Sequence, residues 1–308
     1  MHRLHENTVD ADGFCTHYWE AVPDGTPRGT VVLVHDGAFG SDAATSWGEV
    51  IRLLGDDHRV LAPDLIGFGD SDKAVYLDRS PYVYRAAHLA AFCTAVGVGT
   101  GETGGSGGPG NAGSAGGAGG AHFVGHSFGG SLVLRALASA TPSLPARSGV
   151  SISGSGGPWR SPPAVAELGR FDGTEKDMRR LLDLMVDDYP GLDRAVQARY
   201  ANTRKPGHVE TCLSGRLKHP DPPVAPPAAG APWPEALREC PVPLLVVAGD
   251  RDPLMEPGWT DHFADLSPRV SVRHLDAKHA PNMDRPDEIA ALLLDFFAAQ
   301  PSAAPAAR

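Results

Sequence analysis

One serine lies in a sequence pattern that suits a catalytic nucleophile. The segment GHSFGG (125–130) places Ser127 between glycines two residues before it and two residues after it. It follows the apolar run AHFV (121–124) and precedes the helical pattern SLVLRALA (131–138), so the serine lies on a strand-to-helix turn. Such a turn strains the serine backbone and requires small neighbours. We expect an exposed hydroxyl whose oxyanion is bound by the amide of Phe128, the alternative being a glycine-rich turn that a serine merely caps.

A histidine and an aspartate that could activate this serine follow later in the chain. A serine hydroxyl is a weak nucleophile at neutral pH, so it needs a histidine base, and that base needs an acid to fix its tautomer. The loop GDRDP (249–253) offers Asp250 and Asp252, and the loop KHAP (278–281) offers His279. The order Ser, Asp, His is the one found in serine hydrolases whose nucleophile lies on such a turn. The residues alone leave both aspartates open as the acid.

Short apolar runs rich in β-branched residues alternate with segments of helical period. Continuous apolar runs of this length suit strands that are buried on both faces of a parallel sheet. We therefore expect a doubly wound α/β sheet, preceded by an antiparallel hairpin over 6–21 that turns at Asp12-Gly13. Strands are expected over 30–35, 59–62, 121–124, 243–248 and 270–274, and helices over 84–96 and 131–138.

Residues 154–238 interrupt this alternation and predict an inserted helical cap. The segment contains helical patterns over 175–188 and 192–203 between proline-rich edges. The core domain is then built from 1–153 and 239–300. A cap over the carboxyl edge of a sheet excludes water and shapes a substrate pocket.

Two further segments have little apolar surface to bury. The tract over 97–120 consists almost entirely of glycine, alanine, serine and threonine, and we expect a flexible insertion there. The last residues, 301–308, predict a disordered tail.

The composition excludes several partners. The 308 residues carry 27 Lys and Arg against 37 Asp and Glu, a formal charge of −10, which leaves no net positive field for nucleic acid or an anionic membrane. No run of residues is apolar enough for a signal peptide or a membrane span, so we expect a cytoplasmic protein. The four cysteines lack metal-site spacing, and we predict no metal and no organic cofactor. A small-molecule substrate is expected, and a homodimer is possible.

These motifs, together with PDLIGFGDSDK (63–73), resemble those of the alpha/beta-hydrolase family. The resemblance implies the alpha/beta-hydrolase fold, with a mostly parallel central sheet flanked by helices and an inserted helical cap. In that family the acid lies three residues after the glycine that ends its strand, which implies Asp252 and not Asp250. The segment KHAPNMDRP (278–286) is similar to the family's histidine loop, which implies His279 as the base.

The segment HDGAFG (35–40) resembles the His-Gly loop that supplies the second oxyanion amide in this family. The resemblance implies Gly37 or Ala38 as the donor. Asp36 replaces the commonest glycine, so its carboxylate would lie near a site that must hold negative charge. A turn aspartate without a function is the alternative.

Within the family, the chain is most similar to the carbon-carbon hydrolases that act on meta-cleavage products of aromatic rings. The cap segment over 177–207 resembles theirs, in which an arginine binds the substrate carboxylate, and Arg199 occupies that position. His126 stands where that branch usually has asparagine, and Ala280 where it often has tryptophan. The residues expected to contact substrate are Arg199, His126, Asp36 and Trp159.

The resemblance predicts a serine-nucleophile hydrolase of a small to medium organic carbonyl compound. The bond cleaved would be an ester or a carbon-carbon bond, in bacterial catabolism or specialised metabolism. The departures at Asp36 and His126 favour an alternative: a non-hydrolytic catalyst of cyclisation or addition, or a ligand-binding protein, that acts on a biosynthetic intermediate. An intact triad favours hydrolysis, since a binding protein has no need of all three groups.

Overall fold

The structure is a computed structural model that describes residues 1–99, 120–139, 144–214, 217 and 231–300. Most of the predicted flexible insertion over 97–120, part of the predicted cap and the predicted tail over 301–308 lie outside these residues. Where the chain is described, no helix is both long enough and apolar enough to cross a lipid bilayer.

The described strands form one mixed sheet of eight strands in the order β1-β2-β4-β3-β5-β6-β7-β8. The first two strands form the expected antiparallel hairpin, and β2 is also antiparallel to β4, whereas every later neighbouring pair is parallel. The strands are β1 (His2–Ala11), β2 (Phe14–Pro23), β3 (Thr30–Val34), β4 (Arg59–Pro63), β5 (Ala121–His126), β6 (Ala146–Ile152), β7 (Leu244–Gly249) and β8 (Val270–Leu275).

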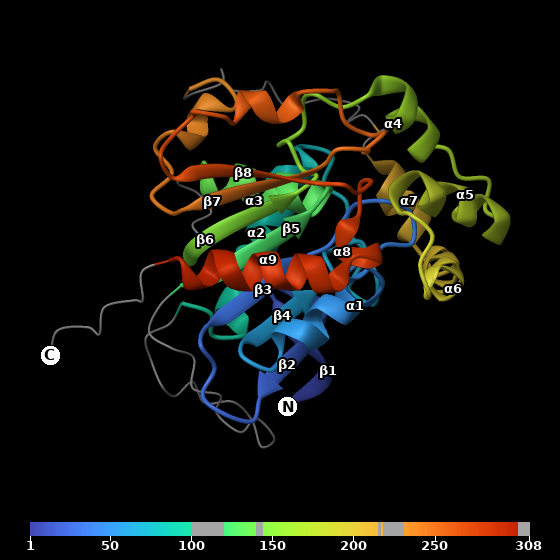
Figure 1. Cartoon of the computed structure of the whole chain (residues 1–308). Coiled ribbons are helices and arrows are strands. Elements are labelled where there is room, and N and C mark those ends of the chain that lie inside the picture. The colour runs from blue at the N-terminus through green and yellow to red at the C-terminus, as the bar shows by residue number, and fades with distance from the viewer. Residues whose placement is uncertain (100–119, 140–143, 215–216, 218–230, 301–308) are drawn as a thin grey trace, which may run out of the picture.

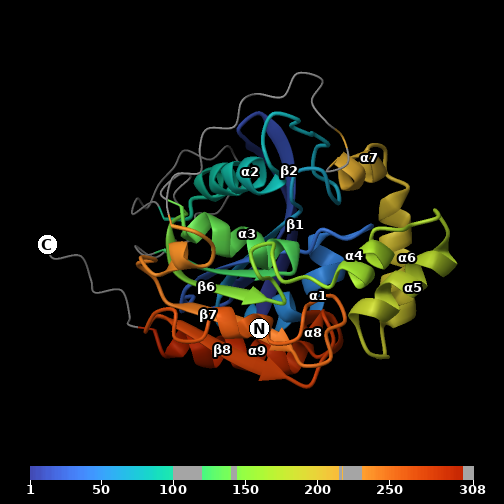
Figure 2. The same cartoon turned by 90° about the horizontal axis from the view of Figure 1, so that it is seen from above.

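Helices cover both faces of this sheet, which gives three layers (Figures 1 and 2). One face packs against α1 (Ala43–Leu54) and α9 (Pro286–Ala298), and the other against α2 (Pro81–Ala95) and α3 (Phe128–Leu137). The short helix α8 (Pro281–Asp284) contacts α1 and α9. Successive side chains of a strand point to opposite faces. In β3, Val31 and Leu33 therefore join the core beneath α1 and α9, while Val32 and Val34 join the core beneath α2 and α3.

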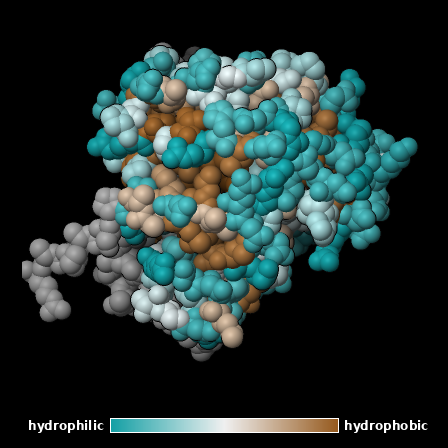
Figure 3. Space-filling view, in the orientation of Figure 1, coloured by the Kyte–Doolittle hydropathy of each residue, from teal (hydrophilic) through white to brown (hydrophobic). Residues whose placement is uncertain are grey.

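The described residues between β6 and β7 include four helices that lie beside the carboxyl ends of the strands (Figure 2). These helices are α4 (Pro162–Leu168), α5 (Glu175–Met185), α6 (Leu192–Thr203) and α7 (His208–Leu213). Met178, Leu181, Leu182 and Met185 form the buried stripe of α5, and they pack with Phe39 of the core. The outward side of these helices is mostly hydrophilic, at the right of Figure 3.

Strand β6 and helix α1 were not among the expected elements. Strand β6 is buried, but its sequence ARSGVSI contains two serines and a glycine, so it lacks a continuous apolar run. Its hydroxyls have internal partners: Ser148 Oγ lies 2.7 Å from His122 Nδ1, and Ser151 Oγ donates to the carbonyl oxygen of Gly154 at 2.7 Å. Because these hydrogen bonds satisfy the serine hydroxyls, the strand can be buried although its sequence is not continuously apolar. The remaining expected strands and helices are present with small shifts of their ends, and α6 has the expected bounds.

Candidate active site

The turn between β5 and α3 holds Ser127 in a strained backbone conformation. Its φ and ψ are 54° and −114°, a region that a residue with a side chain rarely adopts. The flanking glycines are required by space: a Cβ on Gly125 would lie 2.2 Å from the carbonyl oxygen of Gly129, and one on Gly129 would lie 2.3 Å from that of Val34. The predicted strand-to-helix turn is therefore present, with its hydroxyl at the start of a helix.

Ser127, His279 and Asp252 form a continuous hydrogen-bonded chain. His279 Nε2 lies 2.8 Å from Ser127 Oγ, and His279 Nδ1 lies 2.7 Å from Asp252 Oδ2. A carboxylate can only accept, so Nδ1 carries the proton and Nε2 is left to accept the hydroxyl proton of the serine. The other carboxylate oxygen of Asp252 accepts the amide of Leu254 at 2.8 Å, which fixes its orientation. This arrangement can deprotonate the serine as it attacks.

The competing aspartate lies elsewhere. Asp250 Oδ1 is 2.7 Å from Nδ1 of His274 on β8, and both side chains are about half exposed. Asp252 and His279 are instead almost completely buried. The geometry therefore separates the two carboxylates that the residue pattern left open.

Gly37 and Phe128, whose amides are expected to bind an oxyanion, line the same cavity as Ser127. Gly37 packs directly on Phe128, where an added Cβ would lie 3.1 Å from Phe128 Cβ. Neither the Gly37 amide nor the Phe128 amide donates to another described residue. The Ala38 amide, the second donor expected from the sequence, already donates to Asp36 Oδ1 at 2.9 Å. Of the two residues expected for the loop donor, Ala38 already donates to Asp36, whereas the Gly37 amide has no acceptor among the described residues.

The Asp36 carboxylate is neutralised inside the protein. Arg199 of α6 donates to it from both terminal nitrogens, at 2.7 Å and 3.2 Å, and Ser46 Oγ donates to it at 3.0 Å. Burial raises the pKa of this carboxyl, but the charge and hydrogen bonds of Arg199, helped by His126, outweigh that effect and hold the pKa well below its usual value. Asp36 therefore contributes to the cavity wall as one half of an ion pair.

Three residues expected to contact substrate do not line the cavity that the described residues form beside Ser127. Arg199 is 1% exposed and its guanidinium is directed to Asp36, so the expectation that it points into the cleft is wrong. His126 is fully buried behind the triad, where Nε2 donates to the carbonyl oxygen of His279 at 3.0 Å. Trp159 stacks on His262 with ring centres 4.0 Å apart. Each of these three side chains therefore contacts another protein group and does not face the cavity.

The cavity beside Ser127 has a volume of about 380 Å³ and opens between the core and the helices that follow β6. Its wall contains Asp36, Ser127, His279 and two residues that the sequence analysis missed, Arg85 and Ser153. Ser153 follows β6 with a φ of 53°, and its buried hydroxyl has no partner in the described part of the chain. An arginine within the apolar helical pattern over 84–96 was the available signal for Arg85.

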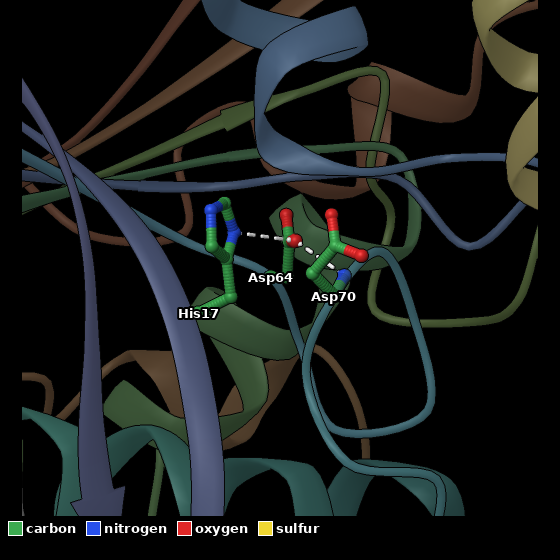
Figure 4. A group of neighbouring side chains, drawn as sticks. All are labelled: His17, Asp64 and Asp70. Atoms are coloured by element: carbon green, nitrogen blue, oxygen red, sulfur yellow. Dashed lines mark hydrogen bonds and ion pairs between the residues drawn. The ribbon is translucent and has the colours of Figure 1, made fainter.

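A second group of polar side chains, His17, Asp64 and Asp70, lies at the carboxyl end of β4 (Figure 4). His17, Asp64 and Asp70 each offer one ligand atom within 4.8 Å of the others, as a metal site requires. Asp64 nevertheless already accepts from His17 Nδ1 at 2.8 Å and from the amides of Ala43 and Asp70 at 2.8 Å and 2.9 Å. These bonds satisfy the carboxylate, so its evident role is to join β2, the start of α1 and the loop after β4.

Comparison with known proteins places these features in a family. The model of the "Alpha/beta hydrolase family" matches residues 31–292. The 2-hydroxymuconate semialdehyde hydrolase of Pseudomonas sp. (strain CF600) is 26% identical over 292 residues, which cover 89% of this chain and 88% of that protein. The 2-hydroxy-6-oxo-6-(2'-aminophenyl)hexa-2,4-dienoic acid hydrolase of Metapseudomonas resinovorans is 40% identical over 68 residues, so the match spans only 22% of either chain.

Solved structures show the same fold at low sequence identity. The 2-hydroxy-6-oxo-6-phenylhexa-2,4-dienoate hydrolase from Rhodococcus sp. strain RHA1 superposes with a TM-score of 0.74 at 22% identity, over 97% of this chain and all of that one. An esterase from Rhodococcus sp. ECU1013 superposes with a TM-score of 0.70 at 20% identity, over 97% and 99% of the two chains. The sheet, the strained serine turn and the match over residues 31–292 lead to one conclusion: this chain belongs to the alpha/beta hydrolase family.

Proposed function

We propose that this protein is a serine hydrolase that cleaves small to medium carbonyl compounds, with esters as the simplest substrates. The observation that carries the proposal is the hydrogen-bonded chain from Ser127 through His279 to Asp252, which ends at a cavity of about 380 Å³. A cavity of that size suits a small organic molecule.

The reaction begins when Ser127 Oγ attacks the substrate carbonyl carbon and His279 Nε2 takes the hydroxyl proton. The negative charge on the carbonyl oxygen is held by the amides of Phe128 and Gly37. Asp252 stabilises the imidazolium that forms. When the tetrahedral intermediate collapses, His279 returns the proton to the leaving alcohol and an acyl-enzyme remains. Water, deprotonated by the same histidine, then releases the acid and restores the serine.

Cleavage of a carbon-carbon bond is a second candidate, which the comparisons favour. Two relatives carry the names of hydrolases that act on ring-cleavage products, a dienoic acid and a muconate semialdehyde. The same triad and oxyanion amides serve such a reaction once the substrate has been converted to its keto form. A product assay with a 2-hydroxy-6-oxo-dienoate and with aryl esters distinguishes the two reactions.

Substitution of the nucleophile tests the proposal. We expect Ser127→Ala to lower kcat for any accepted ester about 10⁴-fold or more, because the triad members act as a unit, and to leave the melting temperature close to that of the parent protein. Ser267→Ala, a serine in the loop before β8, is the matched control and should retain the parent rate. In parallel, a fluorophosphonate should add to the parent protein and not to Ser127→Ala, as read by intact mass. Equal ester turnover in the two variants would refute the proposal.

A further inference from the structure

One buried arginine of the cavity wall has no acidic partner among the described residues. Three arginines of the described residues are at least nine-tenths buried, and two of them form ion pairs: Arg199 with Asp36 and Arg59 with Glu20. The third, Arg85 on α2, is 5% exposed and makes a single hydrogen bond, from Nε to the carbonyl oxygen of Ile66 at 3.4 Å. A guanidinium has five N–H donors. The terminal nitrogens of Arg85 donate to none of the described residues.

Aromatic rings surround the Arg85 guanidinium. Its central carbon lies 5.0 Å from the ring centres of Phe68 and Tyr84 and 5.1 Å from that of Phe128. Ring faces attract a cation but accept no strong hydrogen bond, so they hold the group in place without satisfying its donors. Burial lowers the pKa of Arg85 from its usual value, and the side chain still remains charged at neutral pH. Burying an unpaired charge is costly, so its retention beside a cavity points to a ligand.

The charges around the cavity also favour an anion. The wall contains the guanidinium groups of Arg85 and Arg160 and one carboxylate, that of Asp36. Because Arg199 already neutralises Asp36, the carboxylate does not offset the charge of Arg85. A ligand that enters this cavity therefore meets a net positive wall.

We infer that Arg85 binds a carboxylate on the acyl part of the substrate, an inference that rests on the proposed hydrolase function. The planar fork of a guanidinium matches the two oxygens of a carboxylate. In the proposed mechanism the Phe128 amide binds the oxyanion, and the Phe128 ring contacts Arg85, so the carboxylate would lie a short carbon chain away from the reacting carbonyl.

The position of the base, His279, indicates that the carboxylate belongs to the acyl part of the substrate and not to the leaving group. His279 gives its proton to the leaving group, and it lies in the loop between β8 and α8, on the face of the sheet covered by α1 and α9. Arg85 belongs to α2, on the opposite face (Figure 2). The leaving group and the carboxylate are therefore on opposite sides of the reacting carbon.

Two matched esters test this inference. The mono-p-nitrophenyl ester of glutaric acid and p-nitrophenyl pentanoate have acyl chains of equal length and differ by a terminal carboxylate in place of a methyl group. We expect Arg85→Met to lower the ratio of kcat/KM for the acidic ester to that for the neutral ester at least tenfold. Arg85→Lys should restore part of the ratio, since a point charge replaces the fork. Arg79→Met, an exposed arginine just before α2, is the control and should leave the ratio unchanged.

A binding measurement separates this inference from the proposed reaction. In the Ser127→Ala background, glutarate should bind more tightly than neutral glutaramide by calorimetry, and Arg85→Met should weaken glutarate at least tenfold. If glutarate binding depended on Arg85 but the parent protein hydrolysed neither ester, the result would support the carboxylate site and refute the proposed hydrolase function. Ester turnover with an unchanged ratio in Arg85→Met would sustain the hydrolase and overturn the site. A parent protein that prefers the neutral ester tenfold would also overturn it.

Discussion

Two aspartates that lie two residues apart have different surroundings in this protein. Asp252 is buried and bonded to the base, while Asp250 is exposed and bonded to His274 at the edge of the sheet. A carboxylate–histidine pair that is exposed to water contributes little to stability. The same pair in a buried site controls which nitrogen of the histidine carries the proton. The function of each aspartate is thus determined by its partner and its burial.

This difference makes a direct prediction. Asp252→Asn should reduce kcat for an accepted ester by about 10⁴-fold, because an amide favours the wrong tautomer of His279. Asp250→Asn, the matched control, should stay within about fivefold of the parent, since a surface pair contributes at most about 1 kcal/mol. Steady-state kinetics on both purified variants, with melting temperatures to confirm folding, provides the measurement. Similar losses in both variants would mean that Asp250 also acts on the base.

The residue types of the triad could be predicted from the sequence, but their neighbours could not. The motif around Ser127 has a physical cause that is local, a tight turn between a strand and a helix. The pair between Asp36 and Arg199 joins residues 163 positions apart, and no local pattern reveals that one will neutralise the other. For the same reason the sequence indicated Arg199 as the carboxylate-binding group, whereas the unpaired guanidinium belongs to Arg85.

At the scale of elements, helix α6 is attached to the core by buried polar contacts. Arg199 binds Asp36, and one turn later Asn202 Nδ2 donates to Asp42 Oδ2 at 2.6 Å and to the carbonyl oxygen of Gly40 at 3.0 Å. Gly40, with a φ of 73°, permits this approach, since a Cβ there would lie 2.1 Å from the carbonyl oxygen of Arg199. The helical pattern over 192–203 predicted the helix itself, but the attachment depends on these distant partners.

Removal of one charge of the buried pair should be costly. Arg199→Met leaves the Asp36 carboxylate buried without a cation, and we expect a loss of about 3 to 5 kcal/mol in the free energy of unfolding. Arg194→Met, on the exposed side of the same helix, is the control and should cost less than about 0.5 kcal/mol. The double variant Asp36→Asn, Arg199→Met should recover part of the loss. Urea unfolding of the four proteins tests this, and equal losses at positions 199 and 194 would contradict it.

At the scale of the whole molecule, several histidines of the described residues are buried with a lowered pKa. Burial lowers the pKa of His122 to about 3 and those of His88 and His208 to about 4. These rings pack inside the core; His122 stacks on Phe297 of α9 with ring centres 4.1 Å apart. Burial also lowers the pKa of His35, His58 and His126. His17 is the exception: burial lowers its pKa, but Asp64 and Glu6 raise it further.

This distribution makes the fold sensitive to acid. Between the ordinary histidine pKa of about 6.5 and the lowered values, the unfolded chain binds protons that the folded protein excludes, so stability falls as the pH falls. Each such histidine contributes a slope of about 1.4 kcal/mol per pH unit. His17 acts in the opposite sense, because a raised pKa adds stability that is present below pH 6.5 and is lost as the pH rises. Histidines with a lowered pKa outnumber His17, so we expect the free energy of unfolding to decrease as the pH falls below about 6.5.

A variant outside the active site isolates this effect. The His122→Gln variant lacks the pH dependence that His122 contributes to the free energy of unfolding. The parent protein should therefore lose stability faster than the variant, and the difference between their free energies of unfolding should narrow by about 1.4 kcal/mol for each pH unit below 6.5. His5→Gln changes an exposed histidine of β1 and should keep a constant difference from the parent. Urea unfolding at pH 7.5, 6.5 and 5.5 gives all three curves. If the difference between His122→Gln and the parent stayed constant, the folded protein would protonate His122 near its ordinary pKa, and the ring could not be stacked in a dry core.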